Sequence, residues 1–146
     1  MAHVITFKTN RFDVTKEQPN EANPIAGQGV LIWLREELEK RHYQSTVPDM
    51  EDWGWYMDVN GPGGSYMVGA SAEVEYRNAE DDALAYDATG TEVLDWTLQI
   101  HKQRTFVEKL LGRNKMAADD LLCAQVEEIL KRDGSLEDVS AMRDAV

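Results

Sequence analysis

The 146-residue sequence is poor in cysteine and in long apolar runs. Its one cysteine, Cys123, cannot form a disulfide within a single chain, so nothing points to an oxidising compartment. No window approaches the roughly 20 apolar residues that a membrane-spanning helix needs. Residues 1–10 lack the apolar core of a signal peptide. We therefore expect a cytoplasmic protein that makes no membrane contact.

Basic residues are scarce in the middle of the chain. Residues 49–100 contain twelve acids against one base, Arg77, which accounts for −11 of the formal charge of −12. Such a surface repels polyanions, so direct binding to nucleic acid or to anionic lipid is not expected. The excess of acid favours either a basic partner or simple solubility, and the sequence leaves both interpretations open.

The same middle part of the chain has the pattern of β-strands. Residues 55–59 and 94–100 alternate apolar with polar side chains, which is typical of half-buried strands. The glycine-rich segment 61–64 predicts a turn that leads into a long strand over 66–77, bent near Gly69. An alternating sheet with one polar face is typical of antiparallel strands covered on one side.

Helices are expected on both sides of these strands in the sequence. Asn23-Pro24 resembles a helix start, and an apolar stripe continues from Val30 to Leu38. A capping-box pattern begins at Thr105, and a longer helix is expected over about 116–132. Residues 135–138 favour one last short helix.

Two further strands complete the expected order. They lie at 4–7 and 83–86, while 8–22 is polar and is expected to form a loop. The sequence therefore predicts a single domain over 1–146. Its predicted class is α+β, with an antiparallel sheet of four to five strands and helices packed on one face, in the order β-α-β-β-(β)-β-α-α.

Residues that usually carry chemistry do not form a recognisable motif. Cys123 lies among apolar residues of a predicted helix, where a cysteine behaves as a small core residue rather than a nucleophile. His3, His42 and His101 lack metal-ligand spacing, and the acids at 80–82 lack the loop of an EF-hand. The short G-x-G at 27–29 lacks the rest of a nucleotide-binding loop, and is expected to let a helix approach the sheet. We predict no catalytic, cofactor-binding or metal-binding residue, no cofactor and no enzymatic activity.

A partner-binding surface is the alternative to a catalytic site. If the apolar side chains of each strand face the core, the alternating acids face outward, close to two amphipathic aromatics of the kind favoured at interface centres. The sequence leaves open that both aromatics instead pack under a loop. The candidate partner-binding residues are Trp53, Tyr56, Asp58, Glu73, Glu75 and Asp95.

A basic stretch follows the last predicted strand. It contains five bases with one acid, Glu108, between them. Two interpretations stay open, namely pairing with the acidic strands of a second copy in a homodimer, or pairing with neighbours in the same chain. The bases are Lys102, Arg104, Lys109, Arg113 and Lys115.

Two segments carry a family resemblance. Asp52-Trp53-Gly54-Trp55-Tyr56 and the stretch R-T-F-V-E-K-L-L-G-R at 104–113 together resemble a set of small bacterial α+β proteins with no known activity. The likeness covers about residues 28–132, while the acidic turn at 78–82 and the C-terminal tail fit it poorly. The resemblance implies the fold class and a bacterial source, and it implies no mechanism.

Three functions fit these observations. The preferred hypothesis is a small acidic binding module that neutralises or inhibits a basic partner, as immunity proteins do, because the negative charge is concentrated in the predicted sheet. The first alternative is a phage-type inhibitor that mimics nucleic acid, which requires acids spaced along one strip. The second is a small-ligand protein or enzyme, which requires a deep pocket containing His42 or His101 beside a carboxylate.

Overall fold

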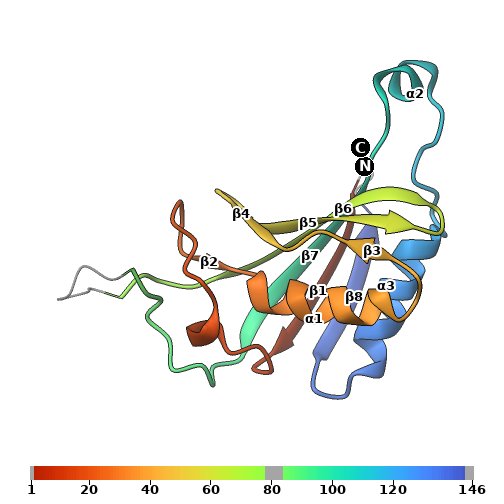
Figure 1. Ribbon diagram of the computed structural model, residues 1–146. Helices are drawn as coiled ribbons and strands as arrows, with labels where there is room; N and C mark the ends of the chain where they lie inside the picture. Colours follow the sequence, from red (N-terminus) through yellow and green to blue (C-terminus); the bar gives the residue numbers. More distant parts are fainter. Residues whose placement is uncertain (1, 78–83, 144–146) are drawn as a thin grey trace.

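The computed structural model describes residues 2–77 and 84–143, and these form one mixed α+β unit (Figure 1). The acids at 80–82, and with them the proposed acidic turn, lie outside the described residues, as does Ala83 at the start of the proposed strand 83–86. In chain order the elements are β1 (His3–Thr9), the 3-10 helix η1 (Val14–Lys16), β2 (Ile25–Ala26), α1 (Gln28–Glu39), β3 (Gln44–Ser45), β4 (Asp49–Glu51), β5 (Gly54–Gly61), β6 (Gly64–Glu73), β7 (Leu94–Lys102), α2 (Phe106–Leu111), α3 (Leu121–Arg132) and β8 (Glu137–Arg143).

The strands pair antiparallel in one sheet with the order β3-β5-β6-β7-β1-β8, to which β2 adds beside β6 and β4 beside β5. The expected α+β class with an antiparallel sheet is therefore confirmed. The expected count of four to five strands is wrong, because the described residues form eight.

The long strands follow the alternation in the sequence. Trp55, Met57 and Val59 of β5 are buried on one face, as predicted, and Trp96, Leu98 and Ile100 of β7 share that face. The turn between β5 and β6 is also confirmed, since Gly61 pairs with Gly64 across it. Burying these side chains stabilises the fold by about 1.5–3 kcal/mol for each large one.

Helices α1 and α3 cover this apolar face of the sheet (Figure 1). Both are amphipathic, and only their inward stripes are buried. The buried helical residues are Val30, Leu31, Leu34 and Leu38 of α1, and Leu122, Cys123, Val126, Ile129 and Leu130 of α3. None of the helices formed by the described residues has the length and apolarity that crossing a bilayer requires.

Helix α2 is different from the other two. It begins with the predicted capping box, in which Thr105 accepts from the Glu108 amide and Glu108 accepts from the Thr105 amide. It ends at Gly112, which adopts the left-handed conformation. None of its residues is buried, and it stands out from the body of the molecule at the tip of a long connection (Figure 1).

Several element boundaries differ from the expectation because tertiary contacts override local preference. Asn23-Pro24 does not start α1, since Ile25 and Ala26 pair with β6 first and Gly27 takes the cap position. Helix α3 begins at Leu121 rather than near Met116, where Asp120 accepts the Leu122 amide. The short helix expected at 135–138 is wrong, because this segment leads into β8, which pairs with β1.

The second half of the predicted long strand also ends early. Strand β6 stops at Glu73, and Tyr76 beyond it makes an isolated bridge with Tyr86. Of the proposed strand 83–86, residues 84–86 are described. They contribute Tyr86 to this bridge and do not form a strand of greater length. The β5–β6 register is continuous across Gly69, so the pairing of these strands contains no bulge there.

Candidate functional site

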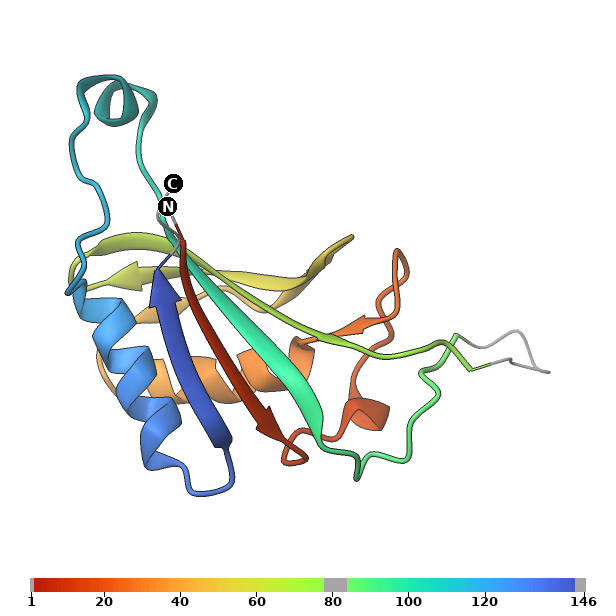
Figure 2. The same ribbon diagram turned by 180° about the vertical axis from the view of Figure 1, so that it is seen from behind.

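The face of the sheet opposite α1 and α3 is covered by none of the helices that the described residues form, and Figure 2 shows β1 and β7 unobstructed from that side. Paired residues of neighbouring strands project to the same side of a sheet. Tyr56 pairs with Gly69, Gly69 with Gln99, and Gln99 with Val4, so these residues form a central row across four strands. We call this surface of the sheet the open face.

An aromatic ring covers Gly69 on the open face. A Cβ atom placed on Gly69 would lie 2.6 Å from Cη2 of Trp53, so the indole lies directly over the glycine backbone. Trp53 remains 37 % exposed there, and Tyr56 lies beside it in the central row. The absence of a side chain at Gly69 thus creates an aromatic centre on the open face.

The segment that carries Trp53 is fixed by two asparagines of the loop before β2. Asn20 is fully buried, and its Nδ2 donates to the carbonyls of Glu51 (2.8 Å) and Gly54 (3.0 Å). Asn23 Nδ2 donates to the Asp52 carbonyl at 2.6 Å. These bonds pair backbone oxygens on both sides of Trp53, that of Gly54 in a buried position, and they hold the turn between β4 and β5 in place.

Carboxylates lie on the same face of the sheet as the aromatic centre. Strand register places six acids on the open face, and Lys8 is the one lysine or arginine that the described strands contribute to it. Three of the acids have partners: Asp58 accepts from Gln103 Nε2 at 2.9 Å, Asp49 accepts from the Met50 amide at 2.8 Å, and Asp95 lies 3.8 Å from Lys8 Nζ. The six acids are Asp49, Glu51, Asp58, Glu73, Asp95 and Glu137.

A cleft opens at one end of this face, where β6 and β7 separate. Its volume is about 430 Å³, and Glu73 and Asp95 both line it, together with Ser71 and Thr97. Both carboxylates are exposed. A cleft with two carboxylates and small hydroxyl side chains offers acceptors for a lysine or arginine side chain.

Most of the residues singled out from the sequence meet on this face. Trp53 and Tyr56 lie at its centre, Asp58 lies on the same strand as Tyr56, and Glu73 and Asp95 lie at the cleft at one end. Glu75 does not belong to the group, because it follows the end of β6 and its backbone carbonyl accepts from Asp87.

Sequence reasoning missed three of the acids on the open face: Asp49, Glu51 and Glu137. Their strands, β4 and β8, were not predicted. The signal that remained in the sequence was Gly69, because a glycine inside a strand often marks the close approach of another group.

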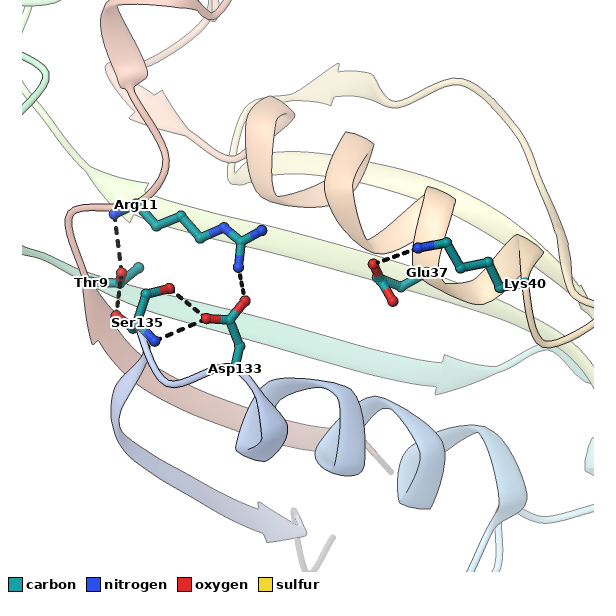
Figure 3. A network of polar contacts seen from close by, with 6 residues as sticks. All are labelled: Thr9, Arg11, Glu37, Lys40, Asp133 and Ser135. Atoms are coloured by element: carbon teal, nitrogen blue, oxygen red, sulfur yellow. Dashed lines mark hydrogen bonds and ion pairs between the residues drawn. The ribbon is translucent and has the colours of Figure 1, made fainter.

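The helix side of the molecule contains a polar network that joins three segments (Figure 3). Arg11 pairs with Asp133 at the end of α3, and its guanidinium lies 4.9 Å from the ring centroid of Trp33 on α1. These residues line a cleft of about 270 Å³ together with Arg41 and Arg132. Each of these three arginines is already paired with a carboxylate, so the cleft is a structural contact rather than an anion site.

The cysteine, the histidines and the G-x-G glycines were the other residues considered for catalysis or ligand binding. Cys123 is buried, as expected, with its Sγ 3.6 Å from Met116 Sδ. His3 Nε2 lies 2.7 Å from Glu127 Oε1. Among residues 2–77 and 84–143 no three His, Cys, Asp or Glu side chains gather as metal ligands would. A Cβ on Gly27 would lie 2.5 Å from the Ala70 carbonyl oxygen, so this glycine lets α1 approach the sheet, as predicted.

No protein-family model matches the chain, and neither does any curated protein or solved structure. The resemblance to small bacterial α+β proteins therefore stays a prediction, and the functional argument rests on the open face.

Proposed function

We propose that this chain is a protein-binding module that recognises a basic partner through the open face and neutralises it by covering its basic surface. The observation that carries the proposal is the presence of six carboxylates together with the aromatic residues Trp53 and Tyr56 on a sheet face that no described helix covers. An exposed aromatic centre inside a polar rim is the usual anatomy of a protein interface.

The two parts of the open face have different tasks in this proposal. The carboxylates attract the partner and orient it during approach, which raises the association rate at low salt. Trp53 and Tyr56 bury apolar area once the surfaces meet, which slows dissociation. The cleft beside Glu73 and Asp95 receives one basic side chain of the partner, which fixes the register of the complex.

The arrangement of the acids favours a protein partner over mimicry of nucleic acid. Uncharged residues separate the acids. Ser71 and Thr97 lie between Glu51 on β4 and strand β1, and Gln99 and Gly69 occupy the central row. A mimic needs charges repeated along one strip, as phosphates are. The enzyme alternative requires a pocket with His42 or His101 beside a carboxylate, and neither histidine lines the cleft at Glu73 and Asp95 or the cleft at Arg11 and Asp133.

The test is capture of basic proteins from a bacterial lysate on the immobilised chain, followed by binding kinetics with the partner it identifies. The face variant is Asp58→Asn/Glu73→Gln/Asp95→Asn. The control is Glu21→Gln/Glu36→Gln/Glu39→Gln, which removes three exposed acids that lie outside the sheet. We expect the face variant to associate at least about tenfold more slowly at low salt, and the control to differ little. Equal losses in both variants would mean that net charge, rather than the open face, governs binding.

A further inference from the structure

We infer that the protein forms a reciprocal dimer in which helix α2 of each copy docks on the open face of the other. This inference rests on the proposed function, because it names a segment that fills the same face. The segment, which we call the arm, comprises residues 103–119 and connects β7 to α3. A basic partner would then have to displace the arm, so the dimer would be the resting state of the module.

Helix α2 of the arm exposes several large apolar side chains to solvent. Phe106 is 78 % exposed and Leu110 is 72 % exposed, and Val107 and Leu111 beside them are also exposed. Four of the six residues of α2 are therefore large, apolar and in contact with solvent. Contiguous apolar surface of this kind marks a binding segment.

The arm is also formed in advance of any partner. The capping box at Thr105 and the left-handed Gly112 close both ends of α2. Arg104 donates to the carbonyls of Arg113 (3.0 Å) and Glu108 (3.2 Å), which ties the start of the arm to the segment after the helix. A segment that is already ordered loses little conformational entropy when it docks.

Charge selects the surface on which the arm docks. The arm carries four bases, Arg104, Lys109, Arg113 and Lys115, and two acids, Glu108 and Asp119, whereas the whole chain has a formal charge of −12. Lys109, Arg113 and Lys115 form no ion pair with the described residues. Two arms placed against each other repel, but an arm placed on the open face meets a surface that carries six carboxylates together with Trp53 and Tyr56.

Helix α2 of the arm does not reach the open face of its own chain. It points away from the sheet in both views of the molecule (Figures 1 and 2), and its base is fixed by the ion pair of Lys102 with Asp120. At that base Gln103 bonds to Asp58 at the rim of the open face. A two-fold axis near this point brings each arm over the other copy. Such a pair is closed, so it does not add further molecules to form a filament.

The test is the oligomeric state by light scattering and sedimentation over a range of protein concentrations. Phe106→Glu is the arm variant, and Val47→Glu is its control, because Val47 is similarly exposed at 69 % but lies outside the arm. Trp53→Ala/Glu73→Gln is the face variant. We expect the wild type and the Val47 variant to dimerise, and the arm and face variants each to dissociate with a constant at least about tenfold higher.

Mixing the arm variant with the face variant decides the geometry. In a reciprocal dimer, one contact remains between the intact arm of one variant and the intact face of the other. The mixture should therefore recover heterodimers, at least about tenfold weaker than the wild-type dimer because a second linked contact is missing. No heterodimer from the mixture, or full dimerisation of the face variant, would overturn docking of the arm on the open face.

A wild type that stays monomeric at every concentration would also overturn the inference. If that monomer sediments with phosphatidylserine vesicles in a manner that depends on Phe106, the arm contacts lipid instead. Either result leaves the proposed function standing, because the monomeric Phe106→Glu variant still has a free open face for the capture experiment. Failure of that monomer to bind any basic protein would count against the proposed function alone.

Discussion

The Nζ atom of Lys102 lies 3.8 Å from Oδ2 of Asp120, and both side chains are almost entirely buried. Lys102 is the last residue of β7, and Asp120 is the cap residue before α3, so the pair joins the two ends of the arm. Asp120 also accepts from the Tyr66 hydroxyl at 2.9 Å and from the Leu122 amide at 3.0 Å. Burial and the neighbouring carboxylate raise the pKa of Tyr66, which keeps its hydroxyl protonated as a donor.

The first prediction is that Asp120→Ala destabilises the protein by about 3 kcal/mol, because it leaves a buried ammonium without its counter-charge and removes a helix cap. The measurement is the free energy of unfolding in urea. Asp95→Ala is the matched control, since Asp95 and Lys8 are also 3.8 Å apart but exposed. We expect that control to cost less than about 1 kcal/mol. Similar losses in the two variants would show that burial does not strengthen the Asp120 contact.

The second prediction concerns Glu17, which is buried against the start of α1. Its Oε1 accepts the amides of Gly27 (3.0 Å) and Gln28 (2.9 Å), yet burial outweighs these bonds and raises its pKa. A carboxyl whose pKa is raised by folding stabilises the folded state most below its unfolded pKa of about 4.3. This contribution is lost as the pH rises through the folded pKa.

Glu17→Gln should therefore change how stability depends on pH. The wild type should gain stability relative to the variant as the pH falls from neutral towards about 4, because only the wild type takes up the proton. The free energy of unfolding of both proteins, measured by denaturant titration at a series of pH values, provides the comparison. A constant difference across this range, or a relative loss of wild-type stability on acidification, contradicts the assignment.

The third prediction concerns Gly69 and the ring that covers it. Gly69→Ala should displace Trp53, because the new methyl group would lie 2.6 Å from its indole. The sheet itself should tolerate the change, since alanine in a strand is about 0.5–1 kcal/mol more favourable than glycine. We expect unchanged or higher stability together with weaker binding through the open face.

A double-mutant cycle with Trp53→Ala is the measurement for this prediction. If Gly69→Ala acts only by moving the indole, it adds no further loss of affinity once the indole is absent. An equal loss in both backgrounds would instead assign the effect to the strand. Trp53 is partly exposed whereas Trp55 and Trp96 are buried, so stronger acrylamide quenching should accompany the displacement.

The sequence predicted those elements whose side chains are divided between a buried and an exposed face. Strands β5 and β7 alternate strictly because one face packs on α1 and α3, and this periodicity is visible without the structure. Strand β8 could not be predicted in the same way, because it is an edge strand with few apolar residues and a bulge in its pairing with β1. Strands β3 and β4 are too short to carry a period.

The candidate site was predictable in its residues but not in its geometry. Alternation alone sent Tyr56, Asp58 and Asp95 outward, and the structure agrees. The position of Trp53 over Gly69 depends on the register of β5 with β6 and on a turn held by Asn20, and neither leaves a periodic pattern. Register is a long-range property, so it follows from pairing rather than from local sequence.

The fourth prediction concerns Asn20, the buried side chain that holds this turn. Asn20→Ala removes the donor to the Glu51 and Gly54 carbonyls and the acceptor for the Ala22 amide, at 2.9 Å. Losing three hydrogen bonds, one of them to the buried Gly54 carbonyl, should cost about 2–3 kcal/mol of unfolding free energy in urea.

Asn10→Ala is the control for this loss, since the Asn10 amide makes one exposed bond, to the Thr91 carbonyl at 3.3 Å. We expect that variant to change the free energy of unfolding by less than about 0.5 kcal/mol. Asn20→Ala should also weaken binding through the open face under conditions in which the protein is fully folded, because the segment around Trp53 loses its support. A variant that loses stability but keeps full affinity would show that the indole is held by Gly69 and its own strand, and that the loop before β2 has no part in positioning the open face.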